Sequence, residues 1–205
     1  MRTYVYVDGF NFYYRVVKGT RYKWLDFSAL CHLLLAGHQI EKIKYFTAKV
    51  SARPNDPDIP TRQQIFLRAL RTIPNLEIIF GQFQQNKVRL PVADPTSVRF
   101  ETVIRTGEKG SDVNLASHPL NDGHRGRYRA AVIISDDSDL AEPLRMVKEE
   151  MNLVTGILTG RQRPSRSLHR YATFYKQIRE GVLQASQFPN VLTDKAGTFH
   201  KPSRW

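Results

Sequence analysis

Aspartates stand in three short segments of the chain, from which their side chains could bind one metal ion. They are Asp8 in the segment VDGFN, Asp112 in EKGSDV, and Asp136, Asp137 and Asp139 in SDDSDL. Two carboxylates about 4 Å apart repel each other by roughly 4 kcal/mol at an effective dielectric constant of about 20. A cluster of them is therefore destabilising or partly protonated unless a cation lies between them. Oxygen ligands without Cys or His suit Mg²⁺ or Mn²⁺, which can orient a water molecule and polarise a phosphoryl group.

These aspartates follow short apolar runs that are typical of buried strands. We expect strands at 3–7, 43–50, 76–80, 129–134 and 153–158, and helices at 27–36, 61–73, 111–120, 138–151 and 167–184. Such alternation predicts a mostly parallel sheet with helices on both faces. In these sheets, functional groups lie beyond the carboxyl ends of the strands. If the strands at 3–7 and 129–134 are neighbours, Asp8 and Asp137 meet at one edge of the sheet.

One segment, about 82–106, breaks the alternation. The runs 87–91 and 98–105 look like strands, and Ala93–Thr96 lies between them. We therefore expect an inserted β-hairpin within a domain that spans residues 1–160. Residues 161–205 are expected to form a basic C-terminal helix and tail packed on the same domain, because nine Lys and Arg residues stand there against two acids.

The charge balance indicates the class of partner. The chain of 205 residues has 31 Lys and Arg against 19 Asp and Glu, a net charge of +12. Such an excess favours nucleic acid or an anionic membrane surface. No apolar run approaches the roughly 20 residues that span a bilayer, and the apolar start is too short for a signal peptide. The single cysteine, Cys31, excludes an internal disulfide and a cysteine-built zinc site, so we expect a cytoplasmic protein with no membrane partner.

The three acidic motifs, in this order, resemble those of NYN domains, which belong to the PIN-like nuclease superfamily. The sequence looks most like the LabA/DUF88 branch of that family, over about residues 3–160. The resemblance implies a Rossmann-like, three-layer α/β sandwich and an endoribonuclease-type site that depends on Mg²⁺ or Mn²⁺. The expected substrate is single-stranded or structured RNA, while DNA as a substrate and assembly into a homo-oligomer stay open alternatives.

The resemblance also assigns roles to individual residues. By motif, the residues that match the catalytic and metal-binding cluster are Asp8, Asp112, Asp137 and Asp139, and Asn11 matches the polar residue of the first motif. We expect Asn11 to orient a ligand water or a phosphate oxygen. Asp136 stands where many family members have Gly or Asn. His118 lies near the place where members often have a further acid, so it is either a proton donor or an ordinary helix histidine.

Basic and aromatic residues alternate directly after the first motif, which is a device for binding single strands because bases stack and phosphates pair. The residues that we expect to bind nucleic acid are Lys109, Arg15, Arg21, Lys23, Arg53, Arg62, Arg161 and Arg163. Lys109, three residues before Asp112, is expected to contact the scissile phosphate. Tyr22 or Trp24 is a candidate base platform, with burial in the core as the alternative.

Two other functions compete with the nuclease. The first is an RNA-binding or regulatory module with a catalytically weak or inactive metal site. A pure binder of polyanions, however, gains nothing from an uncompensated acidic cluster. The second, more distant, is a haloacid-dehalogenase-like phosphatase, which needs an Asp two residues after its nucleophile, where this chain has Phe10. A Rossmann redox enzyme and a P-loop NTPase are disfavoured because their glycine-rich motifs are missing from the sequence.

Overall fold

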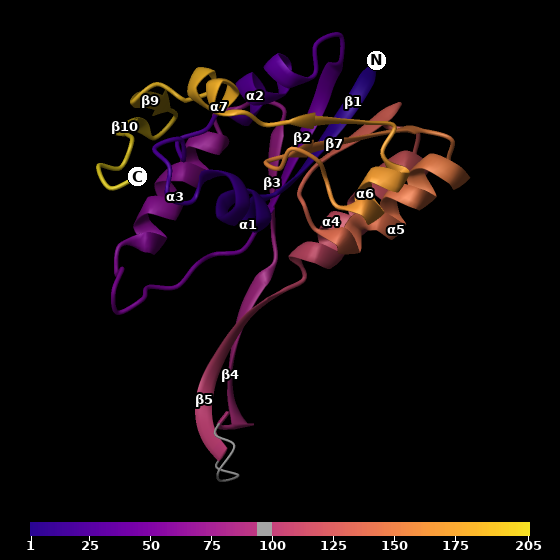
Figure 1. Ribbon diagram of the computed structural model, residues 1–205. Coiled ribbons are helices and arrows are strands. Elements are labelled where there is room, and N and C mark those ends of the chain that lie inside the picture. Colours follow the sequence, from indigo (N-terminus) through magenta and orange to yellow (C-terminus); the bar gives the residue numbers. More distant parts are fainter. Residues whose placement is uncertain (94–99) are drawn as a thin grey trace.

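The computed structural model describes residues 1–93 and 100–205 and is built around a six-stranded sheet in the order β3-β2-β1-β6-β7-β8 (Figure 1). Its strands are β1 (Arg2–Asp8), β2 (Gln39–Thr47), β3 (Leu76–Phe80), β6 (Ala130–Ile134), β7 (Val154–Thr159) and β8 (Phe174–Gln177). Every neighbouring pair in this sheet is parallel. The predicted mostly parallel α/β sandwich is therefore confirmed.

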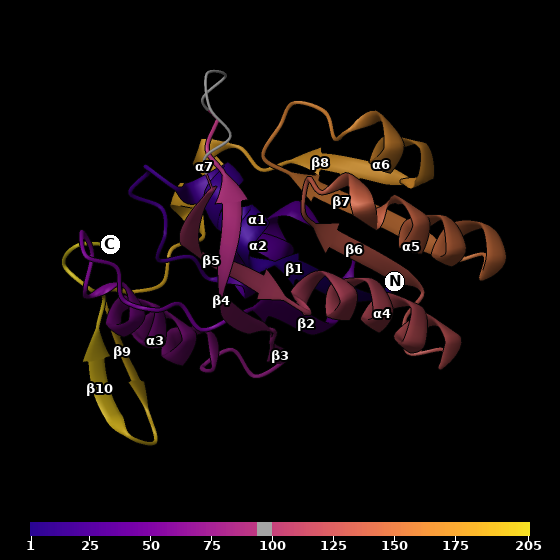
Figure 2. The same ribbon diagram turned by 90° about the horizontal axis from the view of Figure 1, so that it is seen from below.

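Helices cover both faces of the sheet, which gives the three layers (Figure 2). The α-helices are α1 (Gly9–Phe12), α2 (Phe27–Leu34), α3 (Ile59–Leu70), α4 (Ser111–His124), α5 (Ala141–Arg145), α6 (Arg166–Tyr171) and α7 (Glu180–Ala185). Three short turns extend two of these helices: the π-helical turn η1 (Tyr13–Val17) follows α1, and the 3₁₀ turn η2 (Ser138–Leu140) and the π-helical turn η3 (Met146–Glu150) lie on either side of α5. Among the described residues, no helix is both long and apolar enough to cross a membrane.

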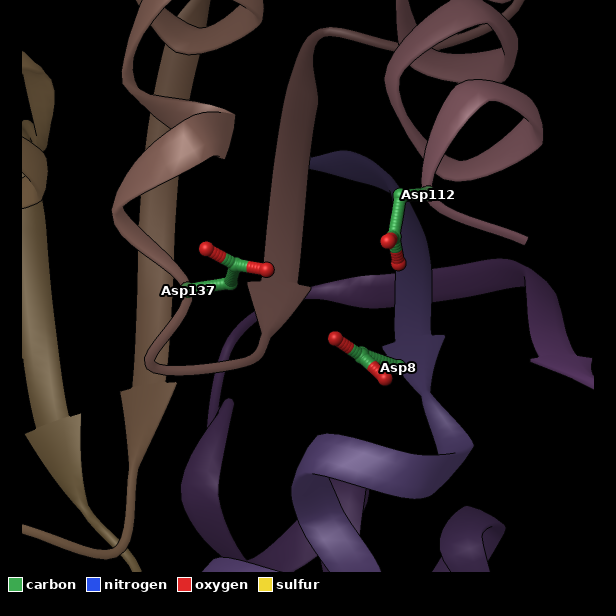
Figure 3. Close-up of side chains that lie close together, drawn as sticks. All are labelled: Asp8, Asp112 and Asp137. Carbon is green, nitrogen blue, oxygen red and sulfur yellow. The ribbon is translucent and has the colours of Figure 1, made fainter. Parts of the chain in front are cut away.

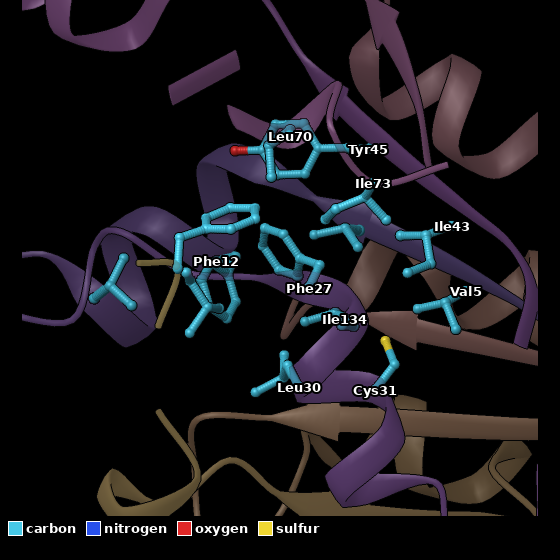
Figure 4. Packing of buried hydrophobic residues seen from close by; sticks show 14 of the residues in the cluster. Val5, Phe12, Phe27, Leu30, Cys31, Ile43, Tyr45, Leu70, Ile73 and Ile134 are labelled. Atoms are coloured by element: carbon cyan, nitrogen blue, oxygen red, sulfur yellow. The ribbon is translucent and has the colours of Figure 1, made fainter. Parts of the chain in front are cut away.

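Alternating side chains of the central strands supply two cores, because successive residues of a strand point to opposite faces. Val5 and Val7 of β1 join the core under α2, α3 and α7, part of which is drawn in Figure 4. Tyr6, between them, joins the core under α4, α5 and α6. Cys31 is fully buried in the first core beside Val5, which fits a packing role.

The strand order reverses between β1 and β6, which are parallel neighbours with Val7 opposite Ile134. From β1 the chain runs outward to β2 and β3 on one side, and from β6 to β7 and β8 on the other. Loops leaving two such strands diverge, so a crevice opens beyond their carboxyl ends. Asp8 ends β1 and Asp137 follows β6. The predicted pairing of these two strands is thus confirmed.

The predicted hairpin is present and its strands are longer than expected. Strands β4 (Gln82–Pro91) and β5 (Phe100–Lys109) pair antiparallel from Gln82–Lys109 to Pro91–Phe100. They form an arm that extends away from the sandwich (Figure 1). Most of the predicted turn, 94–96, and the start of the second predicted strand, 98–99, lie outside the described residues.

The single helix that we predicted over 167–184 is wrong. The segment forms α6, then strand β8, then α7, and β8 pairs with β7 as the edge strand of the central sheet. The tail beyond it, which shows no periodicity in sequence, forms a second hairpin of β9 (Val191–Asp194) and β10 (Gly197–His200). The C-terminal extension therefore contributes a strand to the same sheet as the N-terminal motifs.

Candidate metal centre

Three of the predicted aspartates converge beyond the carboxyl ends of β1 and β6. Asp8, Asp112 and Asp137 each offer one carboxylate oxygen, and these oxygens all lie within 4.8 Å of one another (Figure 3). They come from the end of β1, the first turn of α4 and the loop after β6. We call these three side chains the carboxylate cluster. Residues more than 100 positions apart in the sequence thus meet at the point where the strand order reverses.

Asp8 is the buried member of the cluster, with 8% of its surface exposed. Its Oδ1 accepts a hydrogen bond from the backbone N–H of Asn11 (2.9 Å), so Asp8 also caps the short helix α1. Its Oδ2 accepts one from the Oγ of Ser135 (3.0 Å). The Asn11 side chain in turn accepts from the backbone N–H of Asp136 (3.0 Å). Asn11 and Ser135 therefore fix the Asp8 carboxylate to the loop after β6.

The loop after β6 holds Asp137 through local hydrogen bonds. Its backbone N–H donates to Ser135 Oγ (3.1 Å), and its Oδ1 accepts from the backbone N–H of Asp139 (3.1 Å), which caps the turn η2. Ser135 Oγ thus contacts both Asp8 and Asp137. The position of Ser135 Oγ between the Asp8 carboxylate and the Asp137 backbone N–H had no distinct signal in the sequence.

Asp112 reaches the cluster because the hairpin turns sharply into α4. Gly110 precedes the helix with φ +93°, a left-handed conformation that side chains disfavour and glycine adopts readily. Ser111 then starts the helix, and Asp112 lies in its first turn, where the helix dipole favours a carboxylate. The motif EKGSDV therefore encodes the end of a strand, a glycine turn and a helix start in sequence.

A buried polar network fixes α4 to the sheet. Asp122 is fully buried and receives Lys44 Nζ at 2.6 Å and the Tyr6 hydroxyl at 3.0 Å. Arg127 Nη1 donates to its other oxygen at 3.0 Å. Lys44 Nζ also lies 3.0 Å from His118 Nδ1. Because these groups belong to β1, β2 and α4, the network sets the position of the helix that carries Asp112.

The sequence model of the NYN domain family matches residues 2–179, which includes all three members of the carboxylate cluster. The chain belongs to the NYN domain family. It is thereby a member of the PIN-like nuclease superfamily, as the three motifs indicated.

Two known proteins show how far the likeness of this NYN domain extends. The chain is 31% identical over 236 aligned positions to 6-hydroxy-3-succinoylpyridine 3-monooxygenase HspA of Pseudomonas putida, covering 100% of this chain and 75% of that protein. A crystal structure of a Vibrio parahaemolyticus protein of unknown function has the same fold, with a TM-score of 0.58 and 17% identity. That likeness covers 87% of this chain and 93% of the other.

The donor set of the NYN domain fits a hard divalent cation. The three ligand atoms are carboxylate oxygens, the class that Mg²⁺ and Mn²⁺ prefer, and they are gathered within 4.8 Å. Two oxygens bound to one Mg²⁺ at about 2.1 Å stand at most about 4.2 Å apart, so small side-chain rotations complete the site. The three members of the cluster are all acids, so a bound cation would offset the repulsion between their negative charges.

The pKa of the Asp8 carboxyl is raised by its burial and by the other two acids of the cluster. This pKa is raised from 3.8 to about 6, chiefly by burial and to a smaller extent by the charges of Asp112 and Asp137. The hydrogen bonds from Asn11 and Ser135 act in the opposite direction. The ionised form of Asp8 is thus disfavoured in the folded protein unless a cation lies beside it.

We expect Asp8→Asn to stabilise the metal-free NYN domain at pH 7.5. A carboxyl whose pKa is raised on folding is most favourable below its unfolded value of about 3.9, and stability is lost as the pH rises through about 6. The difference between these two pKa values corresponds to about 3 kcal/mol at pH 7.5. Urea unfolding in chelator should show this gain at pH 7.5 and none at pH 4. In Mn²⁺ the order should reverse, and an Asp8→Asn variant that is less stable in chelator at pH 7.5 would contradict the interpretation.

We expect Ser135→Ala to weaken Mn²⁺ binding by about 10- to 100-fold at pH 7, the usual effect of removing a group that orients a ligand. The Ser135 hydroxyl lowers the pKa of Asp8, so its loss lets the proton compete better with the metal. Titration calorimetry with Mn²⁺ measures the change. Ser138→Ala, at an exposed neighbouring serine, is the matched control. Equal affinities in the two variants would show that Ser135 has no part in the site.

Asp136 and Asp139, the other two acids of the motif SDDSDL, are not members of the carboxylate cluster. Asp136 is buried, and its side chain accepts a hydrogen bond from the Thr159 hydroxyl at the end of β7. Thr159 Oγ1 also accepts from the backbone N–H of Arg161 (3.0 Å). Asp136 therefore ties the loops after β6 and β7 together, beside the cluster. Asp139 is exposed and is not among the three gathered acids, so its role as a ligand stays a prediction.

For His118 and for Tyr22 and Trp24, the sequence left two alternatives open, and in each case the contacts in the structure favour the structural role. His118 lies six residues along α4 from Asp112, about 9 Å of helix, and packs against Phe46 with its ring centroid 5.3 Å away. Burial and the neighbouring Lys44 lower its pKa, so it serves the network of α4 and not the cluster. Tyr22 and Trp24 are buried core residues, and their polar atoms bond Glu180 and the Pro189 carbonyl. Neither is available as a base platform.

The predicted nucleic-acid residues lie on several sides of the cluster. A cavity of about 740 Å³ is lined by Lys23, Arg53 and Arg62, and its wall also includes Gly9, the residue after Asp8. Arg15 and Arg21 line a second hollow of about 720 Å³ that includes Gly160. The other three are exposed: Lys109 directly before Gly110, and Arg161 and Arg163 in the loop after β7. The sequence indicated the basic and aromatic residues of the first cavity that follow the first motif, but no sequence signal indicated that Trp205 joins its wall.

Proposed function

We propose that this protein is a divalent-metal-dependent nuclease that cuts RNA. The observation that carries the proposal is the carboxylate cluster, three acids from three segments gathered within 4.8 Å in a protein of net charge +12. An acidic site surrounded by basic residues suits a substrate whose phosphates need both a metal and cationic side chains. Membership of the PIN-like nuclease superfamily supports the same conclusion.

In this proposal some residues bind the metal ion and others bind the RNA. Asp8, Asp112 and Asp137 hold one Mg²⁺ or Mn²⁺, with Asp139 as an additional predicted ligand. A bound ion of this kind lowers the pKa of a water molecule and stabilises negative charge that develops on a phosphate. Asn11 and Ser135 keep the Asp8 carboxylate oriented through their hydrogen bonds.

The basic side chains near the cluster position the RNA backbone. Lys109 stands three residues before Asp112 and is exposed. Arg161 and Arg163 are exposed in the loop after β7, which a hydrogen bond from Thr159 to Asp136 connects to the loop after β6. The cations of the two hollows, Arg15 and Arg21 in one and Lys23, Arg53 and Arg62 in the other, extend the positive surface on further sides. Such contacts are independent of sequence and should weaken as the salt concentration rises.

The test is cleavage of an end-labelled single-stranded RNA by the purified protein. We expect fragments in Mn²⁺ or Mg²⁺, none with chelator, and slower cutting of single-stranded DNA of the same sequence. RNA that is bound but not cut under any metal condition would favour the binding module over the nuclease. Cutting that persists in chelator would exclude the cluster as a metal site.

A second candidate function comes from the relative at 31% identity along the whole chain, which is named a 6-hydroxy-3-succinoylpyridine 3-monooxygenase. A monooxygenase places one oxygen atom of O₂ in its substrate and reduces the other to water, so it consumes two electrons from a donor. The test is O₂ consumption by the protein with 6-hydroxy-3-succinoylpyridine and NADH. Consumption that requires the pyridine, without RNA cleavage, would replace the nuclease by this activity.

A further inference from the structure

A cavity is lined by residues that directly follow Asp8 of the carboxylate cluster. It has a volume of about 740 Å³, and its wall begins at Gly9, the residue after Asp8. Cavities of roughly 300–1,000 Å³ are the usual size for sites that take a small organic ligand. One member of the carboxylate cluster, Asp8, and the first residue of the cavity wall, Gly9, are therefore consecutive in the chain.

Gly9 is what allows this contact between the cluster and the cavity. A Cβ atom built at Gly9 would lie 2.6 Å from the Phe46 carbonyl oxygen and 2.7 Å from the Tyr45 hydroxyl. Real Cβ atoms do not approach other atoms so closely, so only glycine fits. Helix α1 can therefore start against β2, and the aromatic residues after Gly9 enter the wall of the cavity.

The wall is rich in aromatic rings from distant parts of the chain. The rings that line it include Phe10, Tyr13, Tyr14, Phe66, Phe83 and Trp205. Phe10 of α1 and Phe83 of the hairpin make an edge contact with centroids 5.7 Å apart, and Phe66 and Trp205 lie 5.4 Å apart. Tyr14 is 48% exposed, so part of its ring is open to a ligand. Aromatic rings of this kind stack on planar bases without selecting one sequence.

Positive charge lines the same cavity. Its cationic side chains are Lys23, Arg53, Arg62 and Arg204. Asp56 is the single acid among the described residues that line it, and it forms an ion pair with Arg62. Arg53 is exposed, and no ion pair of its side chain is found in the described part of the chain. The cavity therefore offers rings for a planar ligand and cationic side chains for an anion.

We propose that this cavity binds one nucleotide of the RNA strand next to the bond that is cut, its base against the rings and its phosphate against the cations. The assignment rests on the proposed function, because the strand must continue from the carboxylate cluster into the cavity. A ligand with a planar ring and an anionic group can contact both parts of the wall at once, its ring on the aromatic side chains and its anion on the cationic ones. A ligand with only one of these groups leaves half of the wall unused.

The test measures binding of adenosine 5′-monophosphate to the whole protein in chelator, by titration calorimetry. Adenosine and ribose 5-phosphate serve as probes of the base and the phosphate alone. We expect the nucleotide to bind at least tenfold more tightly than either fragment. Tyr14→Ala and Arg53→Gln should each lower its affinity by about tenfold, since stacking and phosphate contacts are of that size. Both side chains are exposed, so their loss leaves the fold intact.

Matched controls lie far from the cavity. Arg125→Gln, at an exposed arginine at the end of α4, and Phe100→Ala, at a ring that is 49% exposed on the hairpin, should bind the nucleotide as the unaltered protein does. Equal affinity in Tyr14→Ala, Arg53→Gln and the controls would overturn the assignment. So would tight binding of 6-hydroxy-3-succinoylpyridine without binding of the nucleotide, because the cavity would then serve a small heteroaromatic acid.

Binding in chelator separates this assignment from the nuclease activity. Nucleotide binding that is unchanged by Asp137→Asn supports the cavity whether or not RNA is cut. Metal-dependent cutting of RNA without nucleotide binding overturns the cavity and leaves the proposed function standing.

Discussion

Replacement of Asp137 by asparagine is expected to lower the rate of RNA cleavage in saturating Mn²⁺ by about a thousandfold, or about 4 kcal/mol of transition-state stabilisation. The asparagine side chain is nearly the same size and can still accept the hydrogen bond that the Asp139 backbone N–H now donates to Asp137. The change therefore removes one negative charge from the cluster and leaves the loop in place. Single-turnover cleavage of labelled RNA measures the effect, with circular dichroism as the check on folding.

The matched control for this prediction is Asp58→Asn. Asp58 is an exposed aspartate before α3, its side chain makes no capping hydrogen bond, and it is no member of the cluster. Its replacement should leave the rate within about twofold, the usual range for a surface change. If Asp137→Asn cut RNA as fast as Asp58→Asn, catalysis would not depend on the cluster.

Removal of the buried carboxylate in the network of α4 should have the largest effect on stability. We expect Asp122→Ala to lower the free energy of unfolding by about 3–5 kcal/mol, because Lys44 is left charged, 4% exposed and without its acidic partner. For a chain of this length, that corresponds to a melting temperature about 10 °C lower. Since α4 carries Asp112, Mn²⁺ binding should weaken as well. Thermal unfolding and Mn²⁺ titration measure the two effects.

The surface pair of Arg68 and Asp194 provides the comparison for that prediction. The two side chains lie 2.7 Å apart and each is about one-third exposed, so water replaces the lost partner. Asp194→Ala should therefore change the melting temperature much less than Asp122→Ala does. If both variants melted at nearly the same temperature as the unaltered protein, the network would not be what holds α4.

The central sheet could be predicted from the sequence because its strands are short, apolar and separated by amphipathic helices. The C-terminal part could not, since Leu168, Tyr171, Tyr175, Ile178 and Val182 recur at a spacing that is typical of a helix. Residues 174–177 nevertheless pair with β7 and form the edge strand of the sheet. The backbone hydrogen bonds that this segment forms with β7 outweigh its helical pattern of apolar residues. A pattern within one segment does not indicate that an unpaired strand elsewhere in the chain is free to bind it.

Much of the cluster could be predicted because acidic side chains at the ends of neighbouring parallel strands must meet. Asp8 and Asp137 follow from this rule, while Asp112 depended on a motif and on the glycine turn before α4. Asp136 was distinguished from Asp137 only by the family motif, because adjacent residues of a loop can point in either direction. The structure separates them through the hydrogen bond from Thr159, a residue of another strand.

The aromatic cavity shows what sequence patterns cannot supply. Its wall joins the residues after Asp8, the hairpin, α3 and the last residues of the chain. Trp205 contacts Phe66 across 139 positions, and no periodicity in the tail indicated this contact. Contacts of such separation follow from the packing of whole elements, which a local pattern does not encode.

The most direct test of the account is the position of Mn²⁺ in a crystal of the protein, found from anomalous diffraction at the manganese absorption edge. We predict a peak about 2.2 Å from one carboxylate oxygen of each of the side chains at positions 8, 112 and 137. A peak bound elsewhere in crystals soaked in millimolar Mn²⁺ at pH 7.5, or no peak at all, would contradict the account.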